Sequence, residues 1–275
     1  VLPGRGFWRM PCSRLERFWN SGINRFLLPC HFARRWKNNL IWDRGAVIAY
    51  AGVSCPAARS SVGLVRCMGI RRCSALFWDR VAPLYDLAVN TLNRRVYDGT
   101  GSAVARLIRP GDTVLECACG TGAISAAIAP ACARVVATDY SEGMLKQARK
   151  KLARFPHVVV EQADITDLHY ADDSFDAVVA GNVIHLLPEP GDALKEIKRV
   201  VRPGGTIIVP TYVIPKKRAH TMFLRVISRF GVHFQEHFDP VSYRAFFERM
   251  GCTGVTYRVV RGRIPCVIAS FTNDQ

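Results

Sequence analysis

Short apolar runs that alternate with helical patterns over residues 113–213 limit the fold of this chain more than any other feature. The runs are rich in valine and isoleucine, which is typical of strands buried on both faces of a parallel sheet. They occupy residues 113–117, 134–138, 158–161, 175–180 and 206–213, and helical patterns between them include 141–154 and 191–201. This order predicts strands and helices in alternation, with helices covering both faces of the sheet.

The C-terminal part adds two further strand patterns, at 255–260 and 266–271, after a helical pattern over 241–250. The complete expectation is an α/β fold: a doubly wound, mostly parallel, seven-stranded, Rossmann-like sheet with an antiparallel edge strand. Upstream of it, two short helices are expected between residues 77 and 108. Pro203-Gly204-Gly205 is expected to form a tight turn that needs a positive φ and has a structural role.

The first quarter of the chain differs in composition from the rest. The 275 residues carry a formal net charge of +16, and residues 1–67 hold 11 Lys and Arg against two acids, Glu16 and Asp43. Four of the five tryptophans also lie there. Because no helical or alternating pattern would order this segment, we predict a basic N-terminal extension over 1–67, disordered or not native, and a domain over 68–275.

Three interpretations of the extension stay open at this stage. Its arginine-rich, acid-poor composition is similar to that of an organelle transit peptide. Its basic residues with interleaved tryptophans also suit an RNA-binding arm. The third interpretation, which we favour, is an upstream stretch read in frame, with initiation near Met68.

Cysteine spacing and hydropathy exclude several classes of protein. The ten cysteines include no C-x-x-C pair, so neither a disulfide framework nor a zinc site is predicted. Reduced thiols in a cytoplasm explain them better. The longest apolar stretch, residues 46–58, is too short to cross a bilayer. We therefore expect a cytoplasmic protein without a metal centre.

Glycines and carboxylates come directly after the predicted strands, where parallel sheets bind ligands. The Gly120-Thr121-Gly122 loop follows the first strand, and glycines there let the backbone approach a ligand closely. Asp139 ends the second strand, where a carboxylate can accept both hydroxyls of a ribose. Asp164 follows the third strand in a position suited to an adenine amino group, and Met144 can cover the adenine face. The glycine loop and Asp139 by themselves fit either NAD or another adenosine cofactor.

Taken together, these motifs resemble the class I S-adenosylmethionine-dependent methyltransferases, in the branch that includes the ubiquinone and menaquinone C-methyltransferases. The matching segments are E-x-A-C-G-T-G at 116–122, T-D-Y-S-x-x-M-L at 138–145, A-D-I at 163–165, F-D-A-V-V-A-G-N at 175–182 and R-P-G-G at 202–205. The segment from Val81 to Asp86 is also similar to the N-terminal helix that closes over the cofactor in this branch. Ala118 departs from the family, in which many members carry glycine.

The resemblance implies S-adenosylmethionine as the cofactor and assigns residues to it. Glu116 and the glycine loop would hold the methionine end, Asp139 the ribose, and Met144 with Asp164 and Ile165 the adenine. The full expected cofactor-binding set is Glu116, Ala118, Gly120, Thr121, Gly122, Asp139, Tyr140, Met144, Asp164, Ile165 and Asn182. A dehydrogenase on the same fold is disfavoured, because it would require G-x-G-x-x-G and would leave Asp164 without a role.

The expected reaction is an in-line displacement, which mainly requires that the acceptor atom lie behind the methyl carbon. Residues 182–185 follow the fourth strand and should face the transferred methyl group. His185 is the candidate general base, if one is needed, because its ordinary pKa lies near neutrality. A histidine that only packs at a helix start is an equal alternative. Tyr85 is a second candidate, although cofactor closure fits it better.

The acceptor is expected to be a small molecule. Gly181-Asn182-Val183-Ile184 lacks the N-P-P-Y pattern of enzymes that methylate bases, which disfavours nucleic acid. Residues 215–234 combine an apolar helical face with basic residues, which suits an apolar, quinone-like or lipid-like acceptor and a peripheral membrane contact. A plain helix packed on the core is the alternative. Two other functions stay open: a regulatory protein that binds S-adenosylmethionine, and an RNA methyltransferase that uses the N-terminal arm.

Overall fold

The computed structural model describes residues 40–43, 46–49, 61–213 and 238–274, and the chain divides into two units, Val1–Ser60 and Ser61–Gln275. In the first unit, strands β1 (Leu40–Asp43) and β2 (Ala46–Ala49) pair antiparallel as a hairpin. The sequence patterns did not indicate this hairpin. The predicted division into an extension and a domain over 68–275 stays a prediction.

The second unit is built on a mixed sheet of seven strands in the order β5-β4-β3-β6-β7-β9-β8. Strands β3 to β7 run parallel, β9 pairs antiparallel with β7, and β8 pairs antiparallel with β9. Their bounds are β3 Thr113–Cys117, β4 Arg134–Asp139, β5 Val158–Gln162, β6 Phe175–Ala180, β7 Val201–Tyr212, β8 Thr256–Val260 and β9 Cys266–Thr272. The expected fold class and all seven strands are confirmed.

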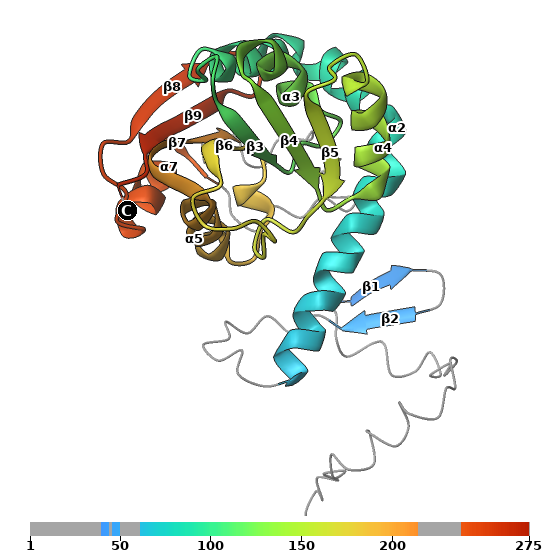
Figure 1. The fold of residues 1–275 in the computed structure, drawn as a ribbon. Coiled ribbons are helices and arrows are strands. Elements are labelled where there is room, and N and C mark those ends of the chain that lie inside the picture. Colours follow the sequence, from blue (N-terminus) through green and yellow to red (C-terminus); the bar gives the residue numbers. More distant parts are fainter. Residues whose placement is uncertain (1–39, 44–45, 50–60, 214–237, 275) are drawn as a thin grey trace, which may run out of the picture. The chain divides into compact units, whose positions relative to one another are not determined.

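Helices cover both faces of the sheet, as Figure 1 shows. One buried cluster joins alternate residues of the strands to α2 (Ser61–Ala105), α3 (Ala123–Ile128) and α4 (Glu142–Leu152). The other cluster joins the opposite strand positions to α5 (Pro190–Val200) and α7 (Pro240–Arg249). The described part of this unit also contains two short 3₁₀ turns, at Ala129–Ala131 and Ile184–Leu186. The strands are therefore buried on both sides, which explains their continuous apolar sequences.

Helix α2 is a run of 45 residues in which two helices join at a kink, so two helices are found as expected but their bounds differ. The run begins at Ser61, inside the segment expected to be an extension, and ends at Ala105. Pro83 lies within its first part and does not end it. The run changes direction at Asn93, whose φ of −150° and ψ of 33° are not helical. Asn93 Nδ2 donates to Ile264 O at 2.9 Å, so the loop between β8 and β9 holds this kink.

The start of β7 also differs from expectation. The strand begins at Val201 directly after α5, and residues 202–205 form an excursion between Val201, which pairs with Phe175, and Thr206, which pairs with Ala177. Gly204 has a φ of 74°, so the expected positive φ is confirmed. Asn273 holds the excursion by donating its backbone N–H to Gly205 O and its side-chain amide to Val201 O, at 2.8 and 2.7 Å.

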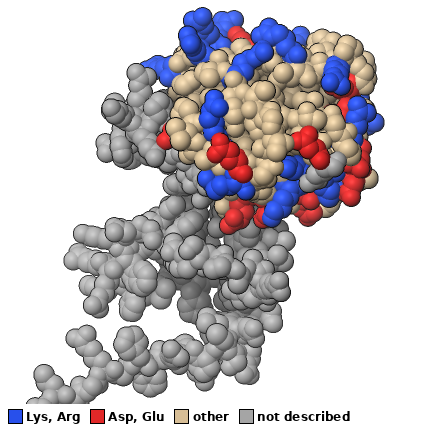
Figure 2. Space-filling model, turned by 90° about the vertical axis from the view of Figure 1, so that its left-hand side faces the viewer, with Lys and Arg blue, Asp and Glu red and all other residues tan. Residues whose placement is uncertain are grey.

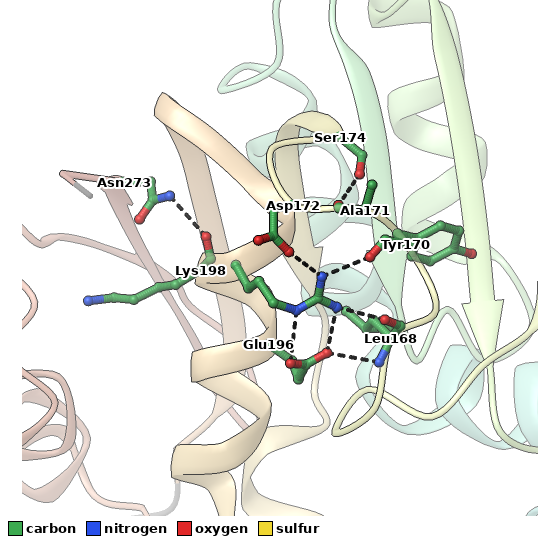
Figure 3. A network of polar contacts seen from close by, with 9 residues as sticks. Leu168, Tyr170, Ala171, Asp172, Ser174, Glu196, Lys198 and Asn273 are labelled. Atoms are coloured by element: carbon green, nitrogen blue, oxygen red, sulfur yellow. Dashed lines mark hydrogen bonds and ion pairs between the residues drawn. The ribbon is translucent and has the colours of Figure 1, made fainter.

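An arginine on α5 orders the connection between β5 and β6 (Figure 3). Arg199 donates to the carbonyl oxygens of Leu168 and Tyr170 at 2.7 and 2.8 Å, and to the Asp172 carboxylate at 2.7 Å. Its guanidinium also binds Glu196 and lowers the pKa of that carboxyl group. This clamp fixes the segment that follows Asp164 at the carboxyl edge of the sheet.

Two properties of the whole unit bear on function. Among the residues that the structure describes, no helix is both long enough and apolar enough to span a membrane. On the face drawn in Figure 2, Lys and Arg are interspersed with Asp and Glu. The positive charge of the second unit is thus spread over this face, with acidic residues between the basic ones.

Candidate active site

The candidate site lies where the order of the strands reverses. Strand β3 has β4 on one side and β6 on the other, so the connections that leave β3 and β6 run to opposite sides. Parallel sheets of this kind bind ligands at the carboxyl ends of the strands beside this point. The segments there are the glycine loop after β3, Asp139 at the end of β4, Asp164 after β5 and Asn182 after β6.

The glycine loop has an unusual backbone. Ala118, Gly120 and Gly122 all have left-handed φ values, of 56°, 55° and 79°. A Cβ on Gly122 would lie 3.0 Å from Leu152 Cδ1, so α4 packs directly against the loop. A Cβ on Gly120 would meet nothing within 4 Å. The loop is therefore compact on the α4 side and borders open space at Gly120.

Glu116 lies beneath this loop and is almost fully buried. Its carboxylate accepts a hydrogen bond from the Ser125 hydroxyl on α3. Burial raises the pKa of Glu116 to about 8. The hydrogen bond from Ser125 acts against this rise, and the charge of Asp139 adds to it. A large share of this carboxyl group is therefore protonated at neutral pH, and it can then donate a hydrogen bond as well as accept one.

Asp139 joins the ends of β3 and β4. Its Oδ2 accepts from the backbone N–H of Gly120 at 2.8 Å, and its Oδ1 accepts from the N–H of Ser141 at 2.9 Å. Burial raises the pKa of Asp139, while these backbone hydrogen bonds act in the opposite direction. A carboxylate has about four acceptor positions, and the Tyr140 backbone is a third donor to this one, so acceptor capacity remains for a ligand hydroxyl.

The residues expected near adenine lie along the next two segments. Met144 is buried in the first turn of α4, where its N–H donates to the Ser141 cap at 3.1 Å. Asp164 Oδ1 accepts from the Thr166 N–H and hydroxyl, at 2.9 and 2.8 Å, while Ile165 is buried in the core. Tyr140 is exposed. The structure thus places Met144 and Asp164 at the carboxyl edge of the sheet, while Tyr140 is exposed to solvent.

Helix α2 lies over the glycine loop and contributes a polar network that no sequence pattern predicted. Asp86 Oδ1 accepts from the Thr121 and Tyr97 hydroxyls at 2.6 and 2.7 Å, and Asp86 Oδ2 accepts from Lys151 Nζ at 2.7 Å. Burial favours a higher pKa for Asp86, but hydrogen bonds from Lys151, Thr121 and Tyr97 outweigh it and lower the pKa. Asp86 is therefore a charged bridge between α2, the loop and the end of α4.

A second contact from α2 reaches the start of α4. Asp79 accepts from the Ser141 hydroxyl at 2.6 Å and from the Gly143 N–H at 2.8 Å. The two helices are so close here that a Cβ on Gly143 would lie 2.6 Å from Asp79 Cα. Asp79 and Asp86 are seven residues apart, which places both on the same face of α2. That spacing was the available sequence signal for these contacts.

Tyr85, the second catalytic candidate, lies beside Asp86 on α2 and packs edge-on against Trp78 at 6.0 Å between ring centroids. Burial, together with the charges of Asp86 and Asp139, raises the pKa of Tyr85 to about 12. Its hydroxyl therefore keeps its proton near neutral pH. It is suited to donating a hydrogen bond and poorly suited to act as a base.

The segment after β6 supplies the remaining candidates. Asn182 has a left-handed φ of 55°, and its N–H donates to Pro210 O at 2.8 Å. Asn182 Oδ1 is buried and accepts no hydrogen bond from any described residue. His185 lies in the 3₁₀ turn after it and is also buried. Residues 215–234, the expected substrate cap, lie outside the described residues.

These features fit an adenosine cofactor with a charged methionine end. The acceptor positions of Asp139 and the unsatisfied Asn182 Oδ1 are hydrogen-bond partners for such a ligand, and Gly120 borders open space at its Cβ position. No group of three or more His, Cys, Asp or Glu in the described part of the chain is arranged to hold a metal ion.

Solved structures identify the class of fold. The S-adenosylmethionine-dependent methyltransferase from Thermotoga maritima has a TM-score of 0.55 at 18% identity and covers 72% of this chain and 98% of its own. A methyltransferase solved with the Trm112 activator from Haloferax volcanii has a TM-score of 0.58, at 18% identity, over 70% and 96%. The enzyme SpnF, described as a [4+2]-cyclase, has a TM-score of 0.53 at 16% identity, over 63% and 79%. These likenesses define the methyltransferase fold without fixing an activity.

Sequence comparison identifies the family. Residues 115–209 match the family model described as a methyltransferase domain. A demethylmenaquinone methyltransferase from Paenarthrobacter aurescens is 31% identical over 73% of this chain and 87% of its own length. One from Clavibacter sepedonicus is 38% identical over 56% of this chain, which spans 65% of that relative. The chain belongs to the class I S-adenosylmethionine-dependent methyltransferases, and the expected family and cofactor are confirmed.

Proposed function

We propose that this protein transfers a methyl group from S-adenosylmethionine to a small, quinone-like acceptor. The observation that carries the proposal is the glycine loop at the point where the strand order reverses. Its left-handed backbone borders open space and is tied to Asp139, with Glu116 beneath it. The printed names of the relatives support a quinone acceptor, since two of them are demethylmenaquinone methyltransferases.

The residues of the site would divide the cofactor among them. Asp139 would accept the ribose hydroxyls through its remaining lone pairs. Glu116 and the backbone of the glycine loop would face the methionine end, while Met144 and the Asp164-Ile165 pair would face the adenine. Asn182 would use its buried Oδ1 to accept a hydrogen bond from the bound ligand, because a buried acceptor without a partner is costly.

When bound, S-adenosylmethionine supplies an electrophilic methyl group on a sulfonium sulfur. The chain's own task is to hold the acceptor atom in line and to keep water away from it. A ring carbon of a quinone in its reduced form becomes nucleophilic when a neighbouring hydroxyl loses its proton. After this carbon takes the methyl group it would release its own hydrogen as a proton, which restores the aromatic ring. We assign this proton to His185 and a supporting hydrogen bond to Tyr85, whose raised pKa keeps its hydroxyl protonated.

We also propose that the enzyme works in the cytoplasm. The cysteines within the described ranges, Cys117, Cys119, Cys132, Cys252 and Cys266, are all free thiols, which suits a reducing compartment. The predicted peripheral membrane contact through 215–234 lies outside the described residues and stays a prediction.

Turnover of a water-soluble acceptor tests the proposal. The full chain is incubated with S-adenosylmethionine and a short-chain demethylmenaquinone analogue in reduced form, and mass spectrometry measures the methylated product and S-adenosylhomocysteine. We expect the two products in equal amounts. His185→Gln should lower kcat at least tenfold while cofactor binding persists.

His157→Gln is the matched control, because His157 lies at the amino end of β5, at the opposite edge of the sheet, and binds Ala129 O at 2.8 Å. This variant should keep normal turnover. A folded wild-type protein that binds the cofactor but methylates no quinone-like acceptor would contradict the proposal.

A further inference from the structure

The first part of α2 presents an outer face that differs from an ordinary solvent-facing helix surface. Between Leu76 and the kink at Asn93, six of the residues with described side chains are exposed, and at about 100° per residue they fall within one arc of about 100°. We call this face the outer stripe; it consists of Leu76, Arg80, Pro83, Leu84, Leu87 and Thr91. The other described side chains of 76–91 are buried or half-buried.

The outer stripe is mostly apolar, whereas solvent-facing helix surfaces are normally polar. The side chains of Leu76, Leu84 and Leu87 are 56%, 67% and 67% exposed. Three large aliphatic side chains on one helix face form a patch, which differs from the scattered exposed leucines found on many proteins. A patch of this kind is the mark of a surface that something else covers.

The charge of α2 indicates what covers it. The helix carries six arginines and three aspartates. Asp79 and Asp86 point inward to α4 and the glycine loop, and the third, Asp98, pairs with Arg94 at 3.4 Å. The outer stripe itself therefore bears one charge, the positive charge of Arg80. Among the described side chains, an apolar face that carries one arginine and no exposed, unpaired acid is complementary to an anionic lipid surface.

We propose that the outer stripe is a docking surface for anionic membranes. The leucines would enter the headgroup region and Arg80 would pair with lipid phosphates. The inference rests on the proposed function in one respect, since it explains how an enzyme with a lipid-like acceptor reaches it. The inner face of the same helix segment carries Tyr85 and Asp86 at the candidate site, so docking sets that site at the membrane surface.

Vesicle co-sedimentation of the full chain tests this surface. The probes are phosphatidylcholine vesicles with and without about one third phosphatidylglycerol, at low and high salt. We expect binding to the anionic vesicles, weakened by salt. Combined Leu76→Gln, Leu84→Gln and Leu87→Gln substitutions should reduce vesicle affinity at least about tenfold. Arg80→Glu should reduce it severalfold.

The matched control is Val241→Gln combined with Val259→Gln, which removes two exposed apolar side chains from α7 and β8, with exposed fractions of 76% and 54%. This variant should bind vesicles as the wild type does. Equal vesicle binding by the wild type and the triple variant would overturn the proposal. So would a dimer in solution that the triple variant loses, because the stripe would then be a protein interface.

Rates of methyl transfer test the docking surface separately from the proposed methyltransferase activity. With a short-chain acceptor in solution, the triple variant should match the wild type. With a long-chain acceptor dissolved in anionic vesicles, its rate should fall about tenfold. Failure of the wild type with the soluble acceptor refutes the proposed function alone. An unchanged rate of the triple variant on vesicles refutes the docking surface alone.

Discussion

Replacing Gly143 by alanine should destabilise the protein, although the same change normally stabilises a helix. In an ordinary helix, glycine to alanine gains up to about 1 kcal/mol. Here a Cβ would lie 2.6 Å from Asp79 Cα and 2.9 Å from Asp79 O, both backbone atoms that cannot move by a side-chain rotation. Helix α2 must therefore shift away from the start of α4.

The magnitude follows from the contacts that this shift breaks. Asp79 accepts hydrogen bonds from Ser141 and Gly143 at 2.6 and 2.8 Å. Bonds to a carboxylate contribute about 1.5 kcal/mol each, so about 3 kcal/mol is lost, against a gain of about 1 kcal/mol. The expected net effect is a decrease of about 2 kcal/mol in the free energy of unfolding, and weaker cofactor binding because α2 no longer rests on α4.

Urea unfolding of Gly143→Ala, a control variant and the wild type measures the change in the free energy of unfolding. Gly191→Ala is the control, because Gly191 is the second residue of α5 as Gly143 is of α4. The nearest atoms to its Cβ are the flexible Met250 Sδ and Cε, at 3.3 and 3.5 Å. This control should be neutral or stabilising. A Gly143→Ala protein as stable as the wild type would refute the close packing of α2 on α4.

Three further predictions concern the site. Ala118→Gly should stabilise the protein by about 0.5–1 kcal/mol in urea unfolding, because Ala118 has a φ of 56° that costs alanine about 1–2 kcal/mol; a loss of stability would contradict the left-handed backbone. Glu116 has its pKa raised from 4.5 to about 8, so its contribution to stability is full below about 4.5 and is lost as the pH rises through about 8. Between about pH 4.5 and pH 8 the unfolding midpoint of the wild type should therefore fall, and that of Glu116→Gln should fall less. The same pH dependence in both proteins would refute the raised pKa of Glu116. Lys151→Met should weaken S-adenosylmethionine binding severalfold by calorimetry, since it releases the Asp86 bridge, whereas the exposed Lys195→Met should not.

Sequence patterns were sufficient for the sheet because burial on both faces imposes a continuous apolar run on each strand. The positions of the glycine loop and of Asp139 could be predicted for a related reason. A residue that directly follows a parallel strand is placed at the carboxyl edge by the strand itself. Local sequence therefore fixed both the elements and the side of the sheet at which the site lies.

Helix α2 could not be predicted in full because its pattern is ambiguous. The leucines of α2 whose side chains are described, Leu76, Leu84 and Leu87, lie on its exposed face, and Pro83 normally marks the end of a helix. The kink at Asn93 depends on a partner, Ile264, that is 171 residues away in the chain. Information of that range is absent from any local window.

The polar network around Asp86 was missed for the same physical reason. Lys151 and Thr121 are 65 and 35 residues from Asp86, and no periodicity connects them. The left-handed φ of Ala118 was likewise hidden, because alanine rarely adopts it. The sequence did show that Ala118 stands where many family members carry glycine, and this is the position at which the backbone is strained.

Calorimetric titration of the full chain with S-adenosylmethionine, S-adenosylhomocysteine and NAD measures cofactor binding at this site. We expect that the first two bind with a stoichiometry of about one, that NAD does not bind, and that Asp139→Ala weakens binding at least tenfold, because the variant loses a charged hydrogen-bond acceptor. A folded wild-type protein that binds neither sulfur compound, or one whose affinity is unaffected by Asp139→Ala, would contradict this expectation.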